Sequence, residues 1–145
     1  MVLESRTWIG RHAEDFAIAE LTAPSRQLLA KNWRWKKHEI DAIFIEMDTV
    51  VFLEVKCRTG CGIFPTSEMW SPSLAQQQRI VRAAHAFVRL NSTSATSSRF
   101  DLAFVRMSKN LNRVIEFLHV PDAFDGSSVC LGRRQCGQPR RGSSR

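Results

Sequence analysis

The sequence of 145 residues predicts an α/β (α+β) fold, in which helices flank a central mixed β-sheet. Amphipathic segments with helical spacing alternate with pairs of apolar segments, in the order helix, strand, strand, helix, strand, strand. The chain length and an apolar fraction of 43% suffice for one hydrophobic core. A helical segment separates the second strand from the third, which predicts a parallel crossover between them.

The N-terminal part of the chain predicts a helix over residues 7–23. Apolar side chains recur there at helical spacing, and Pro24 ends the segment. Residues 26–39 lead onward, and we expect them to finish as an extended segment.

Two apolar segments, residues 40–46 and 50–56, predict a pair of strands joined by a two-residue turn at residues 47–48. Residues 58–72 then form a long loop that contains two glycines and two prolines. Loops of that length inside a compact domain are usually functional or mobile.

The second predicted helix spans residues 71–91, and either Ser71 or Ser73 can cap its N-terminus. A polar loop follows it. Two further apolar segments, residues 99–107 and 113–120, predict the last pair of strands.

The charge divides the chain into a predicted domain, residues 1–125, and a basic tail, residues 126–145. The tail holds five of the 21 basic residues and no acid, so the domain carries 16 basic and 14 acidic residues, and the net charge of +7 falls to +2 without the tail. The tail composition is typical of disorder, and such a tail adds affinity for polyanions without specificity or serves as a solubilising end.

The sequence contains neither an apolar run near the roughly 18 residues of a membrane span nor an N-terminal signal-peptide core, which favours a cytoplasmic protein without a membrane partner. The four cysteines fit free thiols in that compartment, because their spacing does not match the paired knuckles of a zinc site. They are Cys57, Cys61, Cys130 and Cys136.

The predicted hairpin brings acidic and basic side chains together. Alternate residues of a strand share a face, so Glu54 and Lys56 point the same way. A two-residue turn pairs Glu46 with Thr49, and this register sets Asp41 opposite Glu54, with Cβ atoms about 5 Å apart. We therefore expect Asp41, Glu54 and Lys56 to converge at one end of the hairpin.

Two carboxylates that close repel by roughly 3 kcal/mol at an effective dielectric constant of 20. A divalent cation would offset this repulsion, and carboxylate oxygens suit Mg²⁺ or Mn²⁺. Such a metal activates water and stabilises charge on a phosphoryl group, and a neighbouring lysine adds to that stabilisation. The group fits phosphodiester hydrolysis. The alternative is a structural ion pair of Glu54 with Lys56 or with Arg58.

These residues resemble the PD-(D/E)xK nuclease superfamily, in which an aspartate precedes an acid-x-lysine strand. More specifically, the chain resembles the YraN-type predicted endonucleases of bacteria, which are related to Holliday junction resolvases. The resemblance covers about residues 8–124. Five segments carry it in order: GRHAEDFAIAEL, NWRWKKHEIDAIF, VFLEVKCR, QQQRIVRAAHAFV and RFDLAFV.

The resemblance implies a restriction endonuclease-like core and a role for each matching residue. It implies that Asp41 and Glu54 are metal ligands, that the backbone carbonyl of Val55 is a third ligand, and that Lys56 is the catalytic lysine. Glu14, from the first helix, would reach the same site as a further ligand or would orient a metal-bound water.

The chain departs from the family pattern at two positions. His38 stands where the family has a glycine, and it either crowds the start of the strand or adds a ligand. Gln76 stands where the second helix usually has a lysine, and it can still donate a hydrogen bond to a phosphate. Because the acids and Lys56 are present, we count Gln76 among the candidate catalytic residues.

Two aromatic residues and a short polar motif admit more than one role. Trp33 and Trp35 share a face of an extended segment, and they either stack on bases beside the neighbouring basic residues or pack on the helix layer. Arg99 and Asp101 flank a phenylalanine, which indicates structural or site support. Glu39 is expected to be a surface partner of Lys56 or Arg58, and His12, His85 and His119 show no partner at a useful spacing.

The sequence therefore favours a Mg²⁺- or Mn²⁺-dependent endonuclease that acts on DNA, with branched or damaged DNA as one substrate class. Resolvase-like relatives dimerise, so a homodimer is one expected state. The alternative is a non-catalytic nucleic-acid-binding or scaffold protein that keeps the fold and uses its basic tail.

Overall fold

A computed structural model describes residues 2–60, 72–93, 95–110 and 113–126. This part of the chain folds into two helices and five strands, an α/β arrangement with a mixed sheet as predicted. The elements are α1 (Val2–Leu21), β1 (Arg26–Trp35), β2 (His38–Glu46), β3 (Thr49–Thr59), α2 (Leu74–Leu90), β4 (Ser97–Met107) and β5 (Val114–Val120).

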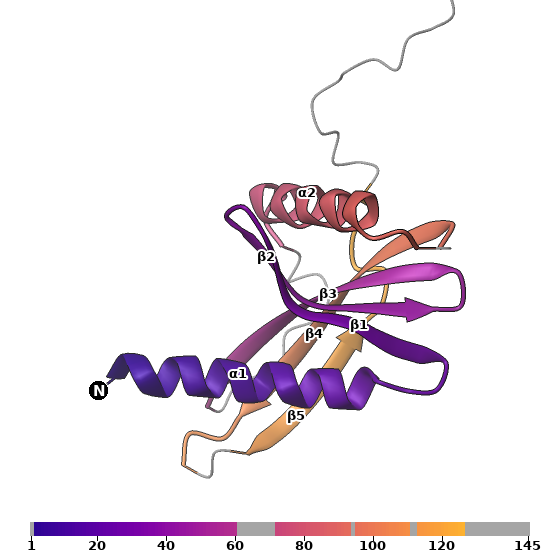
Figure 1. Cartoon of the computed structure of the whole chain (residues 1–145). Helices are drawn as coiled ribbons and strands as arrows, with labels where there is room; N and C mark the ends of the chain where they lie inside the picture. The colour runs from indigo at the N-terminus through magenta and orange to yellow at the C-terminus, as the bar shows by residue number, and fades with distance from the viewer. Residues whose placement is uncertain (1, 61–71, 94, 111–112, 127–145) are drawn as a thin grey trace, which may run out of the picture.

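The strands lie in the sheet in chain order, from β1 to β5. Neighbouring strands are antiparallel except β3 and β4, which are parallel, so the predicted crossover is confirmed. The crossover contains α2, which covers one face of the sheet, while α1 lies across the other face (Figure 1).

The predicted order of elements lacked one strand. The segment that was expected only to finish extended is β1, and it pairs with β2 along most of its length. As an edge strand, β1 keeps no residue fully buried, so it lacks the apolar alternation that marks the inner strands. Helix α1 also begins at Val2, five residues before the predicted start.

Each face of the sheet packs against its helix through a separate hydrophobic cluster. On the α1 face, Ala13 and Ala17 are fully buried against side chains from β2, β3 and β4. On the α2 face, Val81 and Ala84 pack with Phe52 and the other buried residues of that cluster. Ser73 caps α2 by accepting a hydrogen bond from the backbone N–H of Gln76, as one of the two predicted caps.

The predicted turn between β2 and β3 is confirmed, because Glu46 pairs with Thr49 and leaves Met47 and Asp48 as a two-residue loop. Most of the predicted loop at residues 58–72, the tail after Gly126, and three of the four cysteines lie outside the described residues. No helix in the described part of the chain is long and apolar enough to cross a membrane.

Candidate functional site

The candidate site lies where β2 and β3 separate. Their ladder runs from the pair of Glu46 and Thr49 to the pair of Ala42 and Leu53, and it stops there. Beyond that point β2 continues only with β1, while β3 continues with β4. Asp41 and Glu54 are the first residues past the separation, one on each branch, and we call this point the fork.

The alternation of β1 and β2 slips at the fork. Ile40 and Ile43 belong to the same core cluster although they are three residues apart, and so do Ala30 and Trp33. Lys31 and Asn32 lie between Ala30 and Trp33 on β1, and the backbone of Asn32 is left-handed, with φ 48°. The register of β1 and β2 accordingly omits a pair of Asn32 with Asp41, so Asp41 sits at a local irregularity and not in a regular ladder.

The Asp41 carboxylate reaches across the fork to the backbone of β3. Its Oδ2 accepts a hydrogen bond of 2.7 Å from the Val55 N–H. Because the N–H and C=O of one residue in a strand point to the same neighbouring strand, the Val55 carbonyl also faces the fork. The predicted carbonyl ligand therefore has a suitable direction.

Electrostatic interactions join four carboxylates around the fork. Burial and then the charge of Glu54 raise the pKa of Asp41 to about 8, with further contributions from Glu14 and Glu39, while the hydrogen bond from Val55 lowers it. The pKa of Glu14 is raised by burial and then by Glu39, and Glu54 adds to the shift. We call Glu14, Glu39, Asp41 and Glu54 the carboxylate cluster.

Lys56, on β3, pairs with one carboxylate of this cluster. Its Nζ lies 3.0 Å from Oε1 of Glu54, and both side chains are largely shielded from solvent. The predicted shared face is therefore confirmed, and so is the ion pair of Glu54 with Lys56 that was the alternative. A lysine in this position can serve either role, because the same ammonium that neutralises Glu54 can donate to a phosphate.

The donor set of the cluster fits a hard divalent cation by its chemistry. Carboxylate and carbonyl oxygens are the ligands that Mg²⁺ and Mn²⁺ favour, and burial together with the charge of Glu54 raises the pKa of Asp41 to about 8. In the described part of the chain, however, no three His, Cys, Asp or Glu side chains form a ready group of metal ligands. Glu54 is paired with Lys56 in this arrangement.

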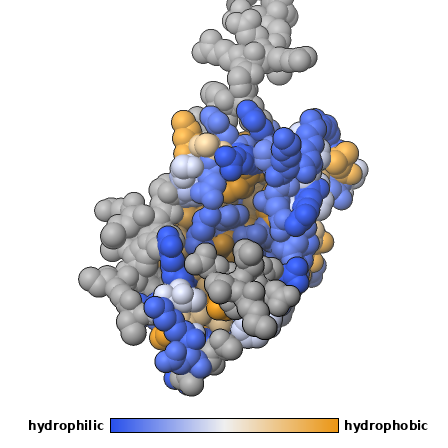
Figure 2. Space-filling model, turned by 90° about the vertical axis from the view of Figure 1, so that its left-hand side faces the viewer, coloured by the Kyte–Doolittle hydropathy of each residue, from blue (hydrophilic) through white to orange (hydrophobic). Residues whose placement is uncertain are grey.

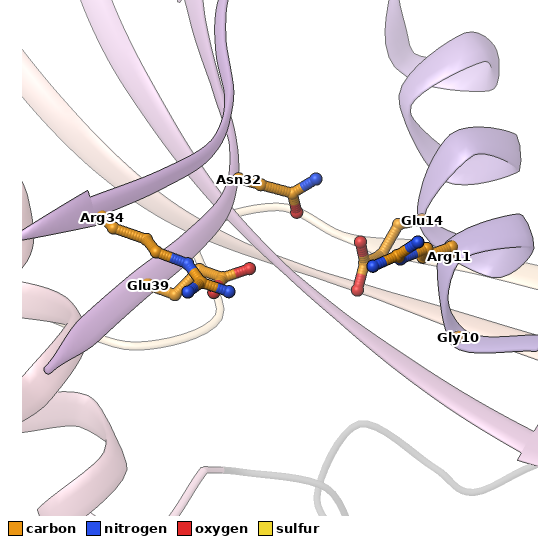
Figure 3. A pocket seen from close by; sticks show the side chains of 6 residues that line it. All are labelled: Gly10, Arg11, Glu14, Asn32, Arg34 and Glu39. Atoms are coloured by element: carbon orange, nitrogen blue, oxygen red, sulfur yellow. The ribbon is translucent and has the colours of Figure 1, made fainter. Parts of the chain in front are cut away.

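Glu14 and Gln76 differ in how the structure relates them to the cluster. Glu14 projects from α1 toward the β1–β2 hairpin (Figure 3) and interacts with Glu39 and Glu54. Gln76 lies in the first turn of α2, and its side chain makes no hydrogen bond to the carboxylates in the part of the chain that the structure describes.

A cavity of about 510 Å³ opens between α1 and the β1–β2 hairpin. Glu14 and Arg11 enter it from the helix, and Arg34 and Glu39 face them from the hairpin (Figure 3). Arg34 is paired with Glu39 at 2.7 Å, a partner that the sequence did not suggest, and Lys56 pairs with Glu54 and not with Glu39. The cavity places cationic and anionic groups beside the fork.

Sequence reasoning missed Arg11, and it considered Arg34 only as one of the basic neighbours of Trp33 and Trp35. Arg11 stands three residues before Glu14, a spacing that puts both on one side of a helix. Arg34 lies opposite Glu39 because Lys36 and Lys37 form the turn between β1 and β2. β1 was not predicted as a strand from the sequence, so this pair could not be predicted.

His38 and the two tryptophans separate into different environments. The Trp33 ring packs edge-on against Phe87 with centroids 5.3 Å apart, which confirms packing on the helix layer for this residue. Trp35 lies farther out and stacks on His38. Nδ1 of His38 is buried, and it has no hydrogen-bond partner in the part of the chain that the structure describes.

A second polar group links β4 to β5 and to the end of β2. Asp101 is 1% exposed and accepts hydrogen bonds from Arg99, from the His119 ring at 2.8 Å and from the Asp122 N–H. Arg99 also binds Glu46. The expectation of structural support for Arg99 and Asp101 agrees with these contacts, whereas His119 has a partner that its sequence spacing did not reveal.

Comparisons with known proteins identify relatives along most of the chain. The model of the uncharacterised protein family UPF0102 matches residues 13–105. A UPF0102 protein of Nitratidesulfovibrio vulgaris (strain DP4) is 33% identical over 138 residues, which are 95% of this chain and 99% of the relative. UPF0102 proteins of Rhodococcus opacus (strain B4) and Pseudomonas syringae pv. tomato are each 34% identical, over 80% and 88% of this chain and 95% and 89% of their own lengths.

Proposed function

The chain belongs to the uncharacterised protein family UPF0102, and we propose that it is a metal-dependent endonuclease of the PD-(D/E)xK type that hydrolyses phosphodiester bonds in DNA. Branched or damaged DNA is the proposed substrate class. Cutting two strands requires two sites, so a homodimer on the substrate belongs to the proposal.

The observation that carries the proposal is the fork itself. Asp41 and Glu54 lie just past the end of one ladder, on adjacent strands; burial and the charge of Glu54 raise the pKa of Asp41 to about 8, and Lys56 stands 3.0 Å from Glu54. Carboxyl groups gathered beside a lysine and a cavity favour a site that binds a cation together with a phosphate.

Asp41, Glu54 and the Val55 carbonyl would hold Mg²⁺ or Mn²⁺, with Glu14 as a further ligand or as an acceptor for a bound water. A cation held there supplies a Lewis acid and a water of lowered pKa. Lys56, which is paired with Glu54 in this structure, would donate to the attacking water or to a phosphate oxygen. Arg11 and Arg34, across the cavity from each other, would bind the flanking phosphates. Gln76 would act only if the bound substrate contacts the first turn of α2.

Cleavage assays test the proposal directly. Plasmid, single-stranded and four-way-junction DNA are incubated with the full chain and Mg²⁺ or Mn²⁺, beside Asp41→Asn and Lys56→Ala. We expect wild-type cleavage that chelation abolishes and that falls at least a hundredfold in both variants, because each removes a group that acts on the reacting phosphate.

Asp48→Asn is the matched control, since it makes the same change at the exposed turn between β2 and β3. It should cleave as wild type does. Equal activity in Asp41→Asn and wild type would refute the proposed site, and activity without metal would refute the proposed chemistry.

A non-catalytic nucleic-acid-binding protein is the second candidate function. The ion pair of Glu54 with Lys56 favours it, because each residue already has a partner without any metal. This candidate predicts DNA binding that neither Asp41→Asn nor Lys56→Ala changes, together with no cleavage of any of the three substrates.

A further inference from the structure

The tip of the β1–β2 hairpin, Trp35–His38, has features that the fork does not use. Trp35 pairs with His38, so Lys36 and Lys37 form the turn. The backbone of Lys36 is left-handed, with φ 56°, a conformation that glycine or asparagine adopts more readily. The geometry of the turn therefore does not explain why lysines occupy it.

The tip presents an aromatic ring together with positive charge. His38 stacks on the half-buried Trp35 with ring centroids 6.3 Å apart, and Nζ of Lys36 lies 4.5 Å from the centre of the Trp35 ring. Trp33, two residues inward, packs against Phe87 instead. Of the two tryptophans on β1, only Trp35 is therefore placed to meet a ligand at the tip.

Lys36 and Lys37 differ from Lys31 and Arg34 of the same hairpin in their ion pairing. Lys31 pairs with Asp15, and Arg34 pairs with Glu39. Lys36 and Lys37 are exposed, and neither forms an ion pair with any residue that the structure describes. Uncompensated charge on a protruding turn attracts polyanions.

The tip and the fork belong to the same strand. His38 precedes Asp41 by three residues, which is about 10 Å along a strand. The hairpin continues past the fork, with its tip on the side of the sheet that carries α2 (Figure 1). Figure 2 shows this end of the molecule, where hydrophilic side chains cover most of the described surface around a recess. A strand bound at the tip could thus reach the fork within a few nucleotides.

We propose that the tip binds an unpaired nucleotide of single-stranded or branched DNA, with the base stacked on Trp35 in place of the Lys36 ammonium and the adjoining phosphates held by Lys36 and Lys37. Every base has a face that can stack on an aromatic ring, but bases inside a continuous duplex are already stacked on each other. The ring therefore selects unpaired bases, while the lysines act on any DNA. The inference rests on the proposed function only in taking DNA as the partner.

Binding measurements with metal chelated separate this inference from catalysis. Full-length protein in EDTA is titrated into fluorescein-labelled oligothymidine and into a blunt duplex of equal length. We expect Trp35→Ala to weaken oligothymidine binding by about tenfold or more, to change duplex binding much less, and to be rescued largely by Trp35→Phe. Lys36→Ala/Lys37→Ala should weaken both and lower the salt slope on the single strand by about 1.4, or 0.7 for each phosphate contact.

Two controls match these changes elsewhere on the surface. Trp8→Ala removes a half-exposed tryptophan that also stacks on a histidine, His12, but lies on α1. Arg82→Ala/Arg89→Ala removes two exposed charges from α2. Both should bind oligothymidine as wild type does.

Three results would overturn the inference: wild-type protein that binds neither probe, Trp35→Ala that binds oligothymidine as wild type does, or losses that are equal for Trp35→Ala and Trp8→Ala. A tip-dependent preference for single strands without cleavage of any substrate would uphold the tip and refute the nuclease.

Discussion

Among single residues, Asp41 carries the electrostatic conflict of the fork. Burial, together with Glu54, raises its pKa from an ordinary 3.8 to about 8. Between these values the folded protein holds a proton that the unfolded chain releases, so the contribution to stability is complete below about pH 4 and is lost as the pH rises through 8. The residue therefore makes the metal-free fold weaker at high pH.

Asp41→Asn should remove this dependence. The amide keeps an oxygen to accept the Val55 N–H but carries no charge, so we expect the variant to melt several degrees above wild type at pH 8.5 in EDTA and close to it at pH 4.5. Thermal unfolding followed by circular dichroism measures this, with Asp48→Asn as the control. A variant that melts below wild type at pH 8.5 would contradict the assigned pKa.

Metal binding should show the opposite trend with pH. A cation displaces the proton of Asp41, so its affinity rises as that carboxyl group ionises. We expect the increase in melting temperature caused by Mn²⁺ to be larger at pH 8.5 than at pH 6.5; a ligand at 100 times its Kd adds about 2.7 kcal/mol. Asp41→Asn should show almost no increase, and an equal increase in that variant would locate the metal elsewhere.

Among the elements, β4 is held to its surroundings through Asp101. Burial works against the Asp101 charge, but hydrogen bonds from His119, Arg99 and the Asp122 N–H hold the pKa below its ordinary value. A lowered pKa gives stability that is present above the unfolded value and is lost as the pH falls through the folded one. This group therefore favours the fold at neutral pH, where Asp41 opposes it.

Asp101→Asn should lower the free energy of unfolding by about 3–5 kcal/mol at pH 7, because it leaves the Arg99 guanidinium without its buried counter-charge. Urea unfolding measures the loss, and Asp48→Asn again supplies an exposed aspartate for comparison. A loss below about 1 kcal/mol would mean that Glu46 alone neutralises Arg99.

The elements also show how far local pattern predicts this fold. The β2–β3 turn could be predicted because alternation and a two-residue gap fix the register on both sides. β1 could not, since an edge strand that keeps no residue fully buried has little apolar signal. The irregularity at Asn32 and Asp41 could not be predicted either. Extrapolating a regular ladder places Asp41 opposite Glu54 and does not suggest its hydrogen bond from Val55.

At the scale of the whole molecule, the site depends on packing between distant elements. Glu14 approaches Glu39 because α1 lies across the sheet, and no pattern within the helix contains that information. Only the resemblance to nucleases suggested Glu14, and it suggested Gln76 equally, for which the described contacts show no link to the carboxylates. Family motifs identify residues, whereas the packed sheet and helices decide which of them meet.

The basic tail acts at this same scale, because its charge adds to the field of the whole protein. Replacing its five arginines by serine lowers the net charge from +7 to +2 in the full chain. We expect weaker binding to single-stranded and duplex DNA alike, with a salt slope reduced on single strands by at most about 3.5, or 0.7 for each charge. The preference for single strands should remain, since Trp35 is unchanged. Titrations of both DNA probes over a range of salt measure the slopes, and a lost preference would assign strand selection to the tail instead of the hairpin tip. The substituted residues are Arg133, Arg134, Arg140, Arg141 and Arg145.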